Sequence, residues 1–514
     1  MQVLRVMTLA LGVLAVLVLV LAAPKAEAKW TKYKTDLAVV YSEVSDARTR
    51  DFIADIHGLD ATLRLLFSVP ANRKTAPLRL YIFENKSDLT AILPGLPDRV
   101  LGVYSPSIDS LRIMVSGYDF LPNTSFEVRA REVVLHEYAH HFTFQHLTGA
   151  YPAWFIEGIA EWVSTARFAK GKVEIGDAPL GRGRAIASGD WAPLDVILTK
   201  PAHEASFDAR AGAYEIGWLL THYFYSDAAR EQKFLQYLQK LRQDPDQSIA
   251  HFEEVMGKKV GAVQGDLRRY ARGRLPVLIL PLAGGAPPQV EGVPLAADES
   301  ALLATAEALR GTPRPDVRPD LLAKAEADLA KFPQSALAHR SLGHALAWAD
   351  RFDEAMTRLE KAAALDPADA ETLALQGMVL VLKARDKAIS TEAAASLRAE
   401  ALRRLDEAAA LDPLLPQIWF HRAEALDDNA GRAPIDSLLR ARALAPQVQL
   451  TAMRLGERFL RAGLAREVEI VLARLASDPH GGDMADRAQR MIEAAKAGLR
   501  ALPPAEAGNG SSRN

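Results

Sequence analysis

The sequence predicts an α+β domain followed by an all-α domain built from helical repeats. The chain has 514 residues, which exceeds the usual capacity of one hydrophobic core, so we expect at least two folded units. Short apolar runs and one long helical pattern occupy residues 29–123. In the second half, prolines recur at intervals of 34, 46, 33 and 33 residues, which is typical of stacked helix pairs: Pro333, Pro367, Pro413, Pro446 and Pro479.

The N-terminus carries the pattern of an export signal. Arg5 precedes an uncharged apolar stretch over residues 6–23, and an Ala-Glu-Ala sequence ends at Ala28. This pattern is typical of a secretory signal over residues 1–28. The alternative is an uncleaved anchor, because eighteen helical residues cover about 27 Å of a hydrocarbon core about 30 Å thick. We therefore expect a periplasmic or secreted protein, or one anchored in the inner membrane with its domains outside the cytoplasm.

Composition excludes several classes of function. Acidic and basic residues nearly cancel, to a net charge of -2, and no large basic block follows residue 29, so nucleic acid is not an expected partner. The chain contains no cysteine, which excludes a cysteine nucleophile, thiolate metal ligands and disulfides. A metal site in this chain must therefore use histidine and carboxylate ligands.

The region 29–123 is predicted to be a small α+β lobe. An amphipathic helix is expected over residues 46–67, and Pro106, Asp109 and Ser110 favour a hairpin or short loop between the last two strands. Four strands are expected, at residues 37–41, 78–83, 100–104 and 111–115.

The region 124–275 is predicted to be mainly helical. Thr124 or Ser125 is expected to cap a helix that runs to about Leu147, and a second helix is expected to start near Ala153. These two helices carry the residues of greatest chemical interest.

Residues 276–317 are rich in proline and glycine and are predicted to be an interdomain linker with a short helix at about 299–309. Repeats are expected over residues 318–502, with a twelve-residue insertion in one unit and a late helix start at Pro434. Residues 503–514 are expected to be a disordered tail.

A pair of histidines forms the core of a candidate metal site. His136 and His140 are four residues apart on one predicted helix, so both imidazoles can reach one divalent cation. Glu137 lies about 100° further round the helix, where its carboxylate could take a proton from metal-bound water. A tetrahedral zinc site for catalysis needs a third protein ligand and an open position, and Glu157 on the following helix is the candidate ligand.

These residues resemble the gluzincin metallopeptidases, in which a His-Glu-x-x-His helix is followed by a glutamate ligand on an antiparallel helix. The Trp-x-x-Glu-Gly-x-Ala-Glu stretch at residues 154–161 is similar to the ligand helix of gluzincin aminopeptidases and peptidase-MA-like proteins. The resemblance implies a zincin-type catalytic domain in which His136, His140 and Glu157 bind Zn²⁺ and Glu137 is the general base.

Two further side chains are candidates for supporting roles. Glu161, four residues after Glu157, could orient a ligating histidine, although a solvated helix carboxylate fits the pattern too. Tyr214 and Gly217 resemble a Tyr-x-x-Gly element that supplies a phenol to the transition state in those aminopeptidases. The alternative for Tyr214 is a tyrosine packed at the start of a helix.

The sequence also departs from the aminopeptidases. It has no Gly-x-Met-x-Asn segment of the kind that they use to hold the amino terminus of a substrate, so the resemblance does not extend to exopeptidase activity. The strand at 111–115 is instead expected to present its edge to an extended peptide.

In the repeats, the best unit resembles the tetratricopeptide repeat in its pattern of small and large residues: Leu342, Gly343, Leu346, Ala355, Leu359, Ala362 and Pro367. The expected fold is therefore an α+β zincin-type catalytic domain followed by an all-α tetratricopeptide-like solenoid.

The expected function is that of an exported zinc metallopeptidase that cleaves a peptide or protein substrate and binds a protein partner through its repeats. The alternative is a repeat-based scaffold or adaptor of the cell envelope with a structural or vestigial zincin domain. Both hypotheses are consistent with the motifs.

Overall fold

The computed structural model describes residues 29–502, with gaps at 71–74, 94, 98–99, 119–128, 148, 180–185, 187, 189–190, 200–206, 245–247, 283–287, 427–430 and 479–481. The side chains of residues 207–213 are not described either. The predicted signal at 1–28 and the predicted tail at 503–514 lie outside the described residues. Among helices in the described part of the chain, none is both long and apolar enough to cross a bilayer.

A mixed six-stranded sheet forms the centre of the N-terminal region, in the order β4-β5-β3-β2-β1-β9. Strands β2, β3 and β5 run parallel, while β4, β1 and β9 are antiparallel to their neighbours. The four strands predicted from the sequence are confirmed, with shifts of up to three residues at their ends. The bounds are β1 Thr31–Lys34, β2 Ala38–Ser42, β3 Leu78–Phe83, β4 Gly102–Ser107, β5 Ser110–Ser116 and β9 Val293–Pro294.

The edge strands of this sheet are β4 and β9, so the prediction that residues 111–115 present an edge is wrong. The chain turns back at Ser107 and Ser110 and places β5 between β4 and β3. Pro106 lies opposite Leu111 in this hairpin. A proline lacks the backbone N–H that an inner strand would use, so it is tolerated in an edge strand.

Side chains on alternate positions of the strands serve two separate cores. On one face, Leu80 packs with α2 (Asp46–Phe67) and α4 (Ala130–His146). On the other face, Tyr81 packs with α3 (Lys86–Ile92) and α12 (Ala297–Ala308). Helix α2 has the predicted bounds, and the side chain of Ser45 caps its first turn.

The two predicted ligand helices are present, with one change. Helix α4 begins at Ala130, where Arg129 is extended and makes no side-chain cap, so the expected start at Thr124 or Ser125 is wrong and those two residues lie outside the described ranges. Helix α5 (Ala153–Ser164) begins directly after Pro152, as predicted.

The structure next describes the following strands and helices up to residue 271. These are β6 Arg167–Ala169, β7 Lys172–Ile175, α7 Leu194–Thr199, α8 Phe207–Tyr225, α9 Ala228–Gln243, α10 Ser248–Met256 and α11 Val260–Ala271.

The segment 276–317, predicted as a linker, supplies one strand to the six-stranded sheet and one to a second, three-stranded sheet of order β6-β7-β8. Strand β8 (Leu278–Pro281) pairs with β7, and β9 pairs with β1. The short helix expected at 299–309 is α12, at Ala297–Ala308. The proline-rich composition of this segment therefore reflects edge strands and turns, and the segment is not a free linker between domains.

The C-terminal region is entirely helical where the structure describes it, and we call residues 318–496 the helical array. Successive helices pack on one another along the chain. Pro333, Pro367, Pro413 and Pro446 each lie two residues after a helix ends. The bounds are α13 Arg318–Lys331, α14 Ala336–Trp348, α15 Phe352–Leu365, α16 Ala370–Lys383, α17 Thr391–Leu411, α18 Pro416–Ala425, α19 Ala433–Leu444, α20 Gln449–Ala462, α21 Ala465–Ala476 and α22 Gly482–Lys496.

Three glycines show how the helix pairs interlock. A Cβ built on Gly343, Gly377 or Gly456 would lie 2.6–2.7 Å from a leucine of the following helix, namely Leu359, Leu405 and Leu472. The predicted insertion lengthens α17 to 21 residues, and α19 starts late with Pro434 in its first turn, as expected.

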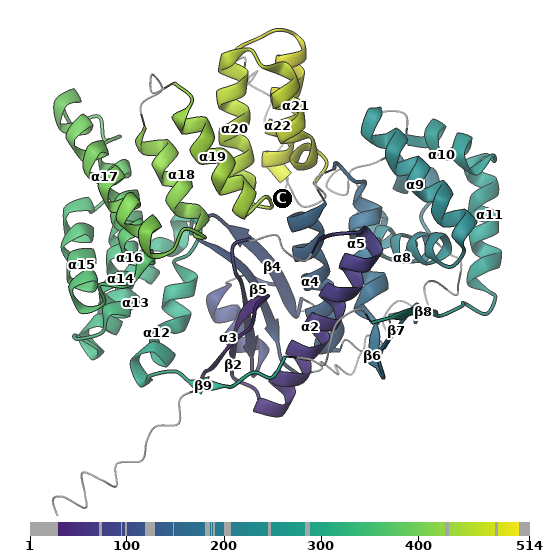
Figure 1. The fold of residues 1–514 in the computed structure, drawn as a ribbon, viewed down its shortest axis with the longest axis horizontal. Helices are drawn as coiled ribbons and strands as arrows, with labels where there is room; N and C mark the ends of the chain where they lie inside the picture. The colour runs from purple at the N-terminus through teal and green to yellow at the C-terminus, as the bar shows by residue number, and fades with distance from the viewer. Residues whose placement is uncertain are drawn as a thin grey trace, which may run out of the picture.

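The array arches over the sheet instead of extending away from it (Figure 1). Helices α13 and α14 contact α12, and α18 to α22 continue above β4 and β5 (Figure 1). The inner side of the array therefore faces the N-terminal region of the same chain.

Candidate metal centre

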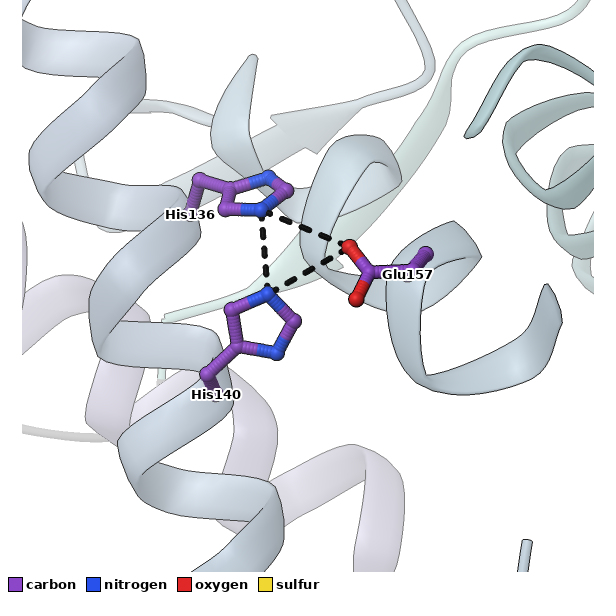
Figure 2. Close-up of side chains that lie close together, drawn as sticks. All are labelled: His136, His140 and Glu157. Carbon is purple, nitrogen blue, oxygen red and sulfur yellow. Dashed lines mark hydrogen bonds and ion pairs between the residues drawn. The ribbon is translucent and has the colours of Figure 1, made fainter. Parts of the chain in front are cut away.

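Three side chains from two helices converge on one point. The Nε2 atoms of His136 and His140 on α4 are 3.0 Å apart. The Oε2 atom of Glu157 on α5 lies 3.7 Å from His136 Nε2 and 3.5 Å from His140 Nε2. Figure 2 shows the two rings and the carboxylate pointing toward one another, as the sequence predicted.

The geometry of this group fits a divalent cation. Ligand atoms about 2.0–2.2 Å from a tetrahedral zinc ion lie about 3.3 Å from one another, and the observed separations of 3.0, 3.5 and 3.7 Å bracket that value. Two imidazoles and a carboxylate suit zinc and other first-row metal ions. Glu157 is only 1% exposed, and a bound cation would offset the cost of burying its charge.

Two glycines allow a third helix to reach the site. A Cβ on Gly158 would collide with the carbonyl group of Gly217, and a Cβ on Gly217 would lie 2.5 Å from the carbonyl oxygen of Trp154. Helices α5 and α8 therefore cross with their backbones in contact. This close crossing brings the N-terminal half of α8 beside the ligand helices.

We expect Gly158→Ala to lower the free energy of unfolding by about 1–3 kcal/mol, because the backbones of α5 and α8 must separate. Gly265→Ala is a matched control: it lies in helix α11 with no atom within 4 Å of its Cβ, and alanine there favours the helix. Chemical denaturation of both variants measures the difference. Equal stability of Gly158→Ala and the wild type would contradict the close crossing.

Tyr214 lies at this crossing, next to His136, a candidate ligand. Its ring stacks on the ring of His136, with centroids 6.4 Å apart and an interplanar angle of 25°. The sequence predicted a helix that opens near Tyr214, but α8 begins earlier, at Phe207, so Tyr214 lies inside the helix and not at its start. The contact of Gly158 with Gly217 explains why this part of α8 reaches α4.

Glu161 lies on the other side of His136. Its Oε1 atom is 3.6 Å from His136 Nδ1, which is an ion-pair distance and longer than a hydrogen bond. Glu161 is 6% exposed, so the alternative of a solvated carboxylate does not apply. A carboxylate on the Nδ1 side favours a proton on that nitrogen and leaves Nε2 as the metal-binding atom.

Glu137 is held by the edge strand. Its Oε2 atom accepts a hydrogen bond of 2.8 Å from the backbone N–H of Tyr104 in β4. The side chain of Glu137 is half-buried, whereas that of Glu157 is fully buried. The carboxylate of Glu137 is therefore fixed between α4 and the strand on which an extended peptide could pair.

Tyr104 and Phe144 belong to this environment and were missed in the sequence. The ring of Phe144 stacks on His140 with centroids 5.9 Å apart, and the ring of Tyr104 stacks on Phe144 at 6.4 Å. Phe144 follows His140 by four residues, so helical periodicity could have revealed it. The position of Tyr104 beside Glu137 depends on the hairpin of β4 and β5, and no local sequence pattern predicts it.

The neighbouring His141 is excluded from the cluster. Its Nδ1 atom lies 3.3 Å from the hydroxyl of Tyr104. Burial, with a smaller contribution from the nearby His146, lowers the pKa of His141 to about 3. His141 is thus a neutral packing residue that contacts Tyr104 and does not belong to the group of His136, His140 and Glu157.

A comparison of the sequence with protein-family models and with curated proteins finds no match. The fold and the site define a class in general terms only: a mixed α/β protein with a helical array and a His₂Glu group that could hold a metal ion.

Proposed function

We propose that the protein is an exported zinc-dependent metallopeptidase of the gluzincin type. The observation that carries the proposal is the convergence of His136, His140 and Glu157 with a fourth residue, Glu137, held half-buried at the edge strand. A structural zinc site would need no carboxylate of this kind beside its ligands.

In this mechanism, a zinc ion when bound supplies Lewis acidity to the scissile carbonyl and lowers the pKa of water. Glu137 accepts a proton from the attacking water and delivers it to the leaving amine. The phenol of Tyr214 donates a hydrogen bond to the oxygen that becomes negatively charged. Glu161 keeps His136 oriented.

The edge strand β4 provides a place for substrate. Tyr104 directs its backbone N–H away from β5 and toward Glu137. A peptide in extended conformation beside β4 would lie next to the proposed general base, which suits an internal peptide bond as well as a terminal one. The proposed substrate class is therefore an extended peptide or an unfolded segment of a protein.

The competing hypothesis is a repeat-based scaffold with a vestigial zincin domain. Scaffolding needs an array with accessible inner side chains, whereas Arg340 and Glu371 of the array are engaged by ion pairs among themselves and with Arg79 of β3. The proposed ligands and general base are also all present together. These two observations favour the peptidase, and binding of a protein partner by the array remains a secondary proposal.

The test is metal analysis combined with a peptide-library digest of the full-length mature protein. We expect about one zinc ion per chain, cleavage of internal peptide bonds, loss of cleavage with 1,10-phenanthroline and recovery on addition of zinc. A protein that binds zinc tightly but cleaves nothing in the library would support the scaffold hypothesis. A protein that binds no divalent metal would refute the proposed site.

A further inference from the structure

The C-terminal half of the array contacts the candidate metal helix directly. Arg474 on α21 donates a 2.5 Å hydrogen bond from Nη1 to the backbone carbonyl of Phe144 on α4 and another from Nη2 to the carbonyl of Pro446. Its guanidinium also lies 5.6 Å from the centroid of the Phe144 ring. A residue 330 positions away in the sequence thus binds the end of the helix that carries His136 and His140.

The carbonyl of Phe144 is one of the last four of α4, which have no partner within the helix. A positive charge is favourable at this end of a helix dipole. Arg474 therefore donates a hydrogen bond to an unpaired carbonyl at the end of α4, and its positive charge interacts favourably with the helix dipole. The same residue that receives this contact, Phe144, stacks its ring on the ligand His140.

The turn between α19 and α20 makes a second contact. The buried Gln447 donates from Nε2 to Gln145 Oε1 at 2.8 Å, and the amide of Ala76, just before β3, donates to the carbonyl of Leu444. Val448 is buried in the same apolar cluster as the residues of α4 and α5. The turn is therefore packed and hydrogen-bonded against α4 and the start of β3.

The Arg474 contact reaches the edge strand as well, through Phe144. The ring of Tyr104 stacks on Phe144, and the backbone of Tyr104 holds Glu137. Two series of contacts therefore lead from Arg474 to the proposed reaction centre. One runs through Phe144 to His140, and the other runs through Phe144 and Tyr104 to Glu137.

Holding a guanidinium at this place has a cost. Burial lowers the pKa of Arg474, with Asp478 acting in the opposite direction, so the charged form is disfavoured there. An apolar side chain could fill such an interface at a lower cost. The charge is therefore better explained by what Arg474 binds than by packing alone.

We infer that Arg474 and Gln447 of the helical array are positioning residues for the metal centre, which they hold through Phe144 and the end of α4. The array is then a structural component of the enzyme as well as a possible partner-binding module. The identity of the ion rests on the proposed function, but the positioning role does not depend on which substrate is cleaved.

The test measures metal binding in the full-length protein. We expect Arg474→Gln to raise the zinc dissociation constant about tenfold, in the range seen when residues behind a metal ligand are changed, and to alter the visible absorption spectrum of the Co²⁺-substituted protein. Arg474→Lys, which retains the charge and one of the two contacts, should lie between Arg474→Gln and the wild type.

Arg466→Gln is the matched control, because Arg466 is exposed on the same helix. It should leave the dissociation constant and the Co²⁺ spectrum unchanged. If Arg474→Gln does not fold, Gln447→Met removes the second contact at similar volume and should shift both readouts in the same direction.

The inference is overturned if a folded Arg474→Gln, or Gln447→Met in its place, binds zinc with wild-type affinity and gives the wild-type Co²⁺ spectrum. A wild-type protein that binds neither Zn²⁺ nor Co²⁺ would refute the proposed function, and this inference with it.

Discussion

Replacing Glu137 with glutamine is expected to lower the rate of peptide hydrolysis about 10³-fold while the zinc content stays unchanged. The amide cannot take a proton from water, but it has the size of the carboxylate. Its oxygen can still accept the hydrogen bond from Tyr104 N–H. The measurements are kcat/KM on a peptide found in the library digest and metal analysis of the purified variant.

Glu467→Gln is a suitable control for Glu137→Gln, because Glu467 is exposed on α21. It should have wild-type activity and zinc content. Hydrolysis retained by Glu137→Gln would rule out the proposed general base even if zinc were bound. Loss of zinc from the same variant would instead make Glu137 part of the metal binding group.

Replacing Glu371 with glutamine is expected to lower the free energy of unfolding by about 3 kcal/mol at pH 7. Glu371 on α16 joins the array to the rest of the molecule through Arg79 of β3 and Arg310 after α12, and within the array it pairs with Arg340 of α14. The distances are 2.7 Å to Arg310 and 3.2 Å to Arg340. Without the carboxylate, three guanidinium groups face one another with less compensation.

The effect should depend on pH in a defined direction. Burial alone would raise the pKa of Glu371, but Arg310, Arg79 and Arg340 together lower it well below the ordinary value. A carboxyl group with a lowered pKa in the folded state stabilises the fold above its unfolded pKa of about 4.3 and loses that contribution as the pH falls below it. The gap between wild type and Glu371→Gln should therefore be full at pH 7 and begin to narrow below about pH 4.

Urea titrations at pH 7 and at pH 3 measure this difference. Glu360→Gln is the matched control, because Glu360 is exposed on the neighbouring helix α15. Its free energy of unfolding should change by less than about 0.5 kcal/mol. A Glu371→Gln variant as stable as this control at pH 7 would show that the ion pairs do not hold the array to the sheet.

The proposed ligands could be found from the sequence because their relation is local. Two histidines four residues apart share a face of any α-helix, and Glu157 and Glu161 repeat that spacing on the next helix. The resemblance to gluzincins then paired the two helices, and their side chains do converge. The glycines of the array were also predictable, because interlocking of adjacent helices repeats at a regular interval.

Other features had no local signal. Which strand forms the edge depends on how the hairpin of β4 and β5 joins β3, and a strand pattern alone does not show this. The proline-rich segment at 276–317 pairs with strands distant in the sequence, so composition suggested a linker where the structure has strands.

The sequence by itself determined the His136, Glu137 and His140 helix, the glutamate that completes the group and the helical periodicity of the array. Only the tertiary structure decided that Tyr104 holds Glu137, that Gly158 and Gly217 bring Tyr214 to His136, and that Arg474 supports α4. The physical reason is the separation along the sequence of the residues that interact. Helical spacing is set by neighbouring residues, whereas contacts between residues tens or hundreds of positions apart exist only when the hydrophobic cores have brought their helices and strands together.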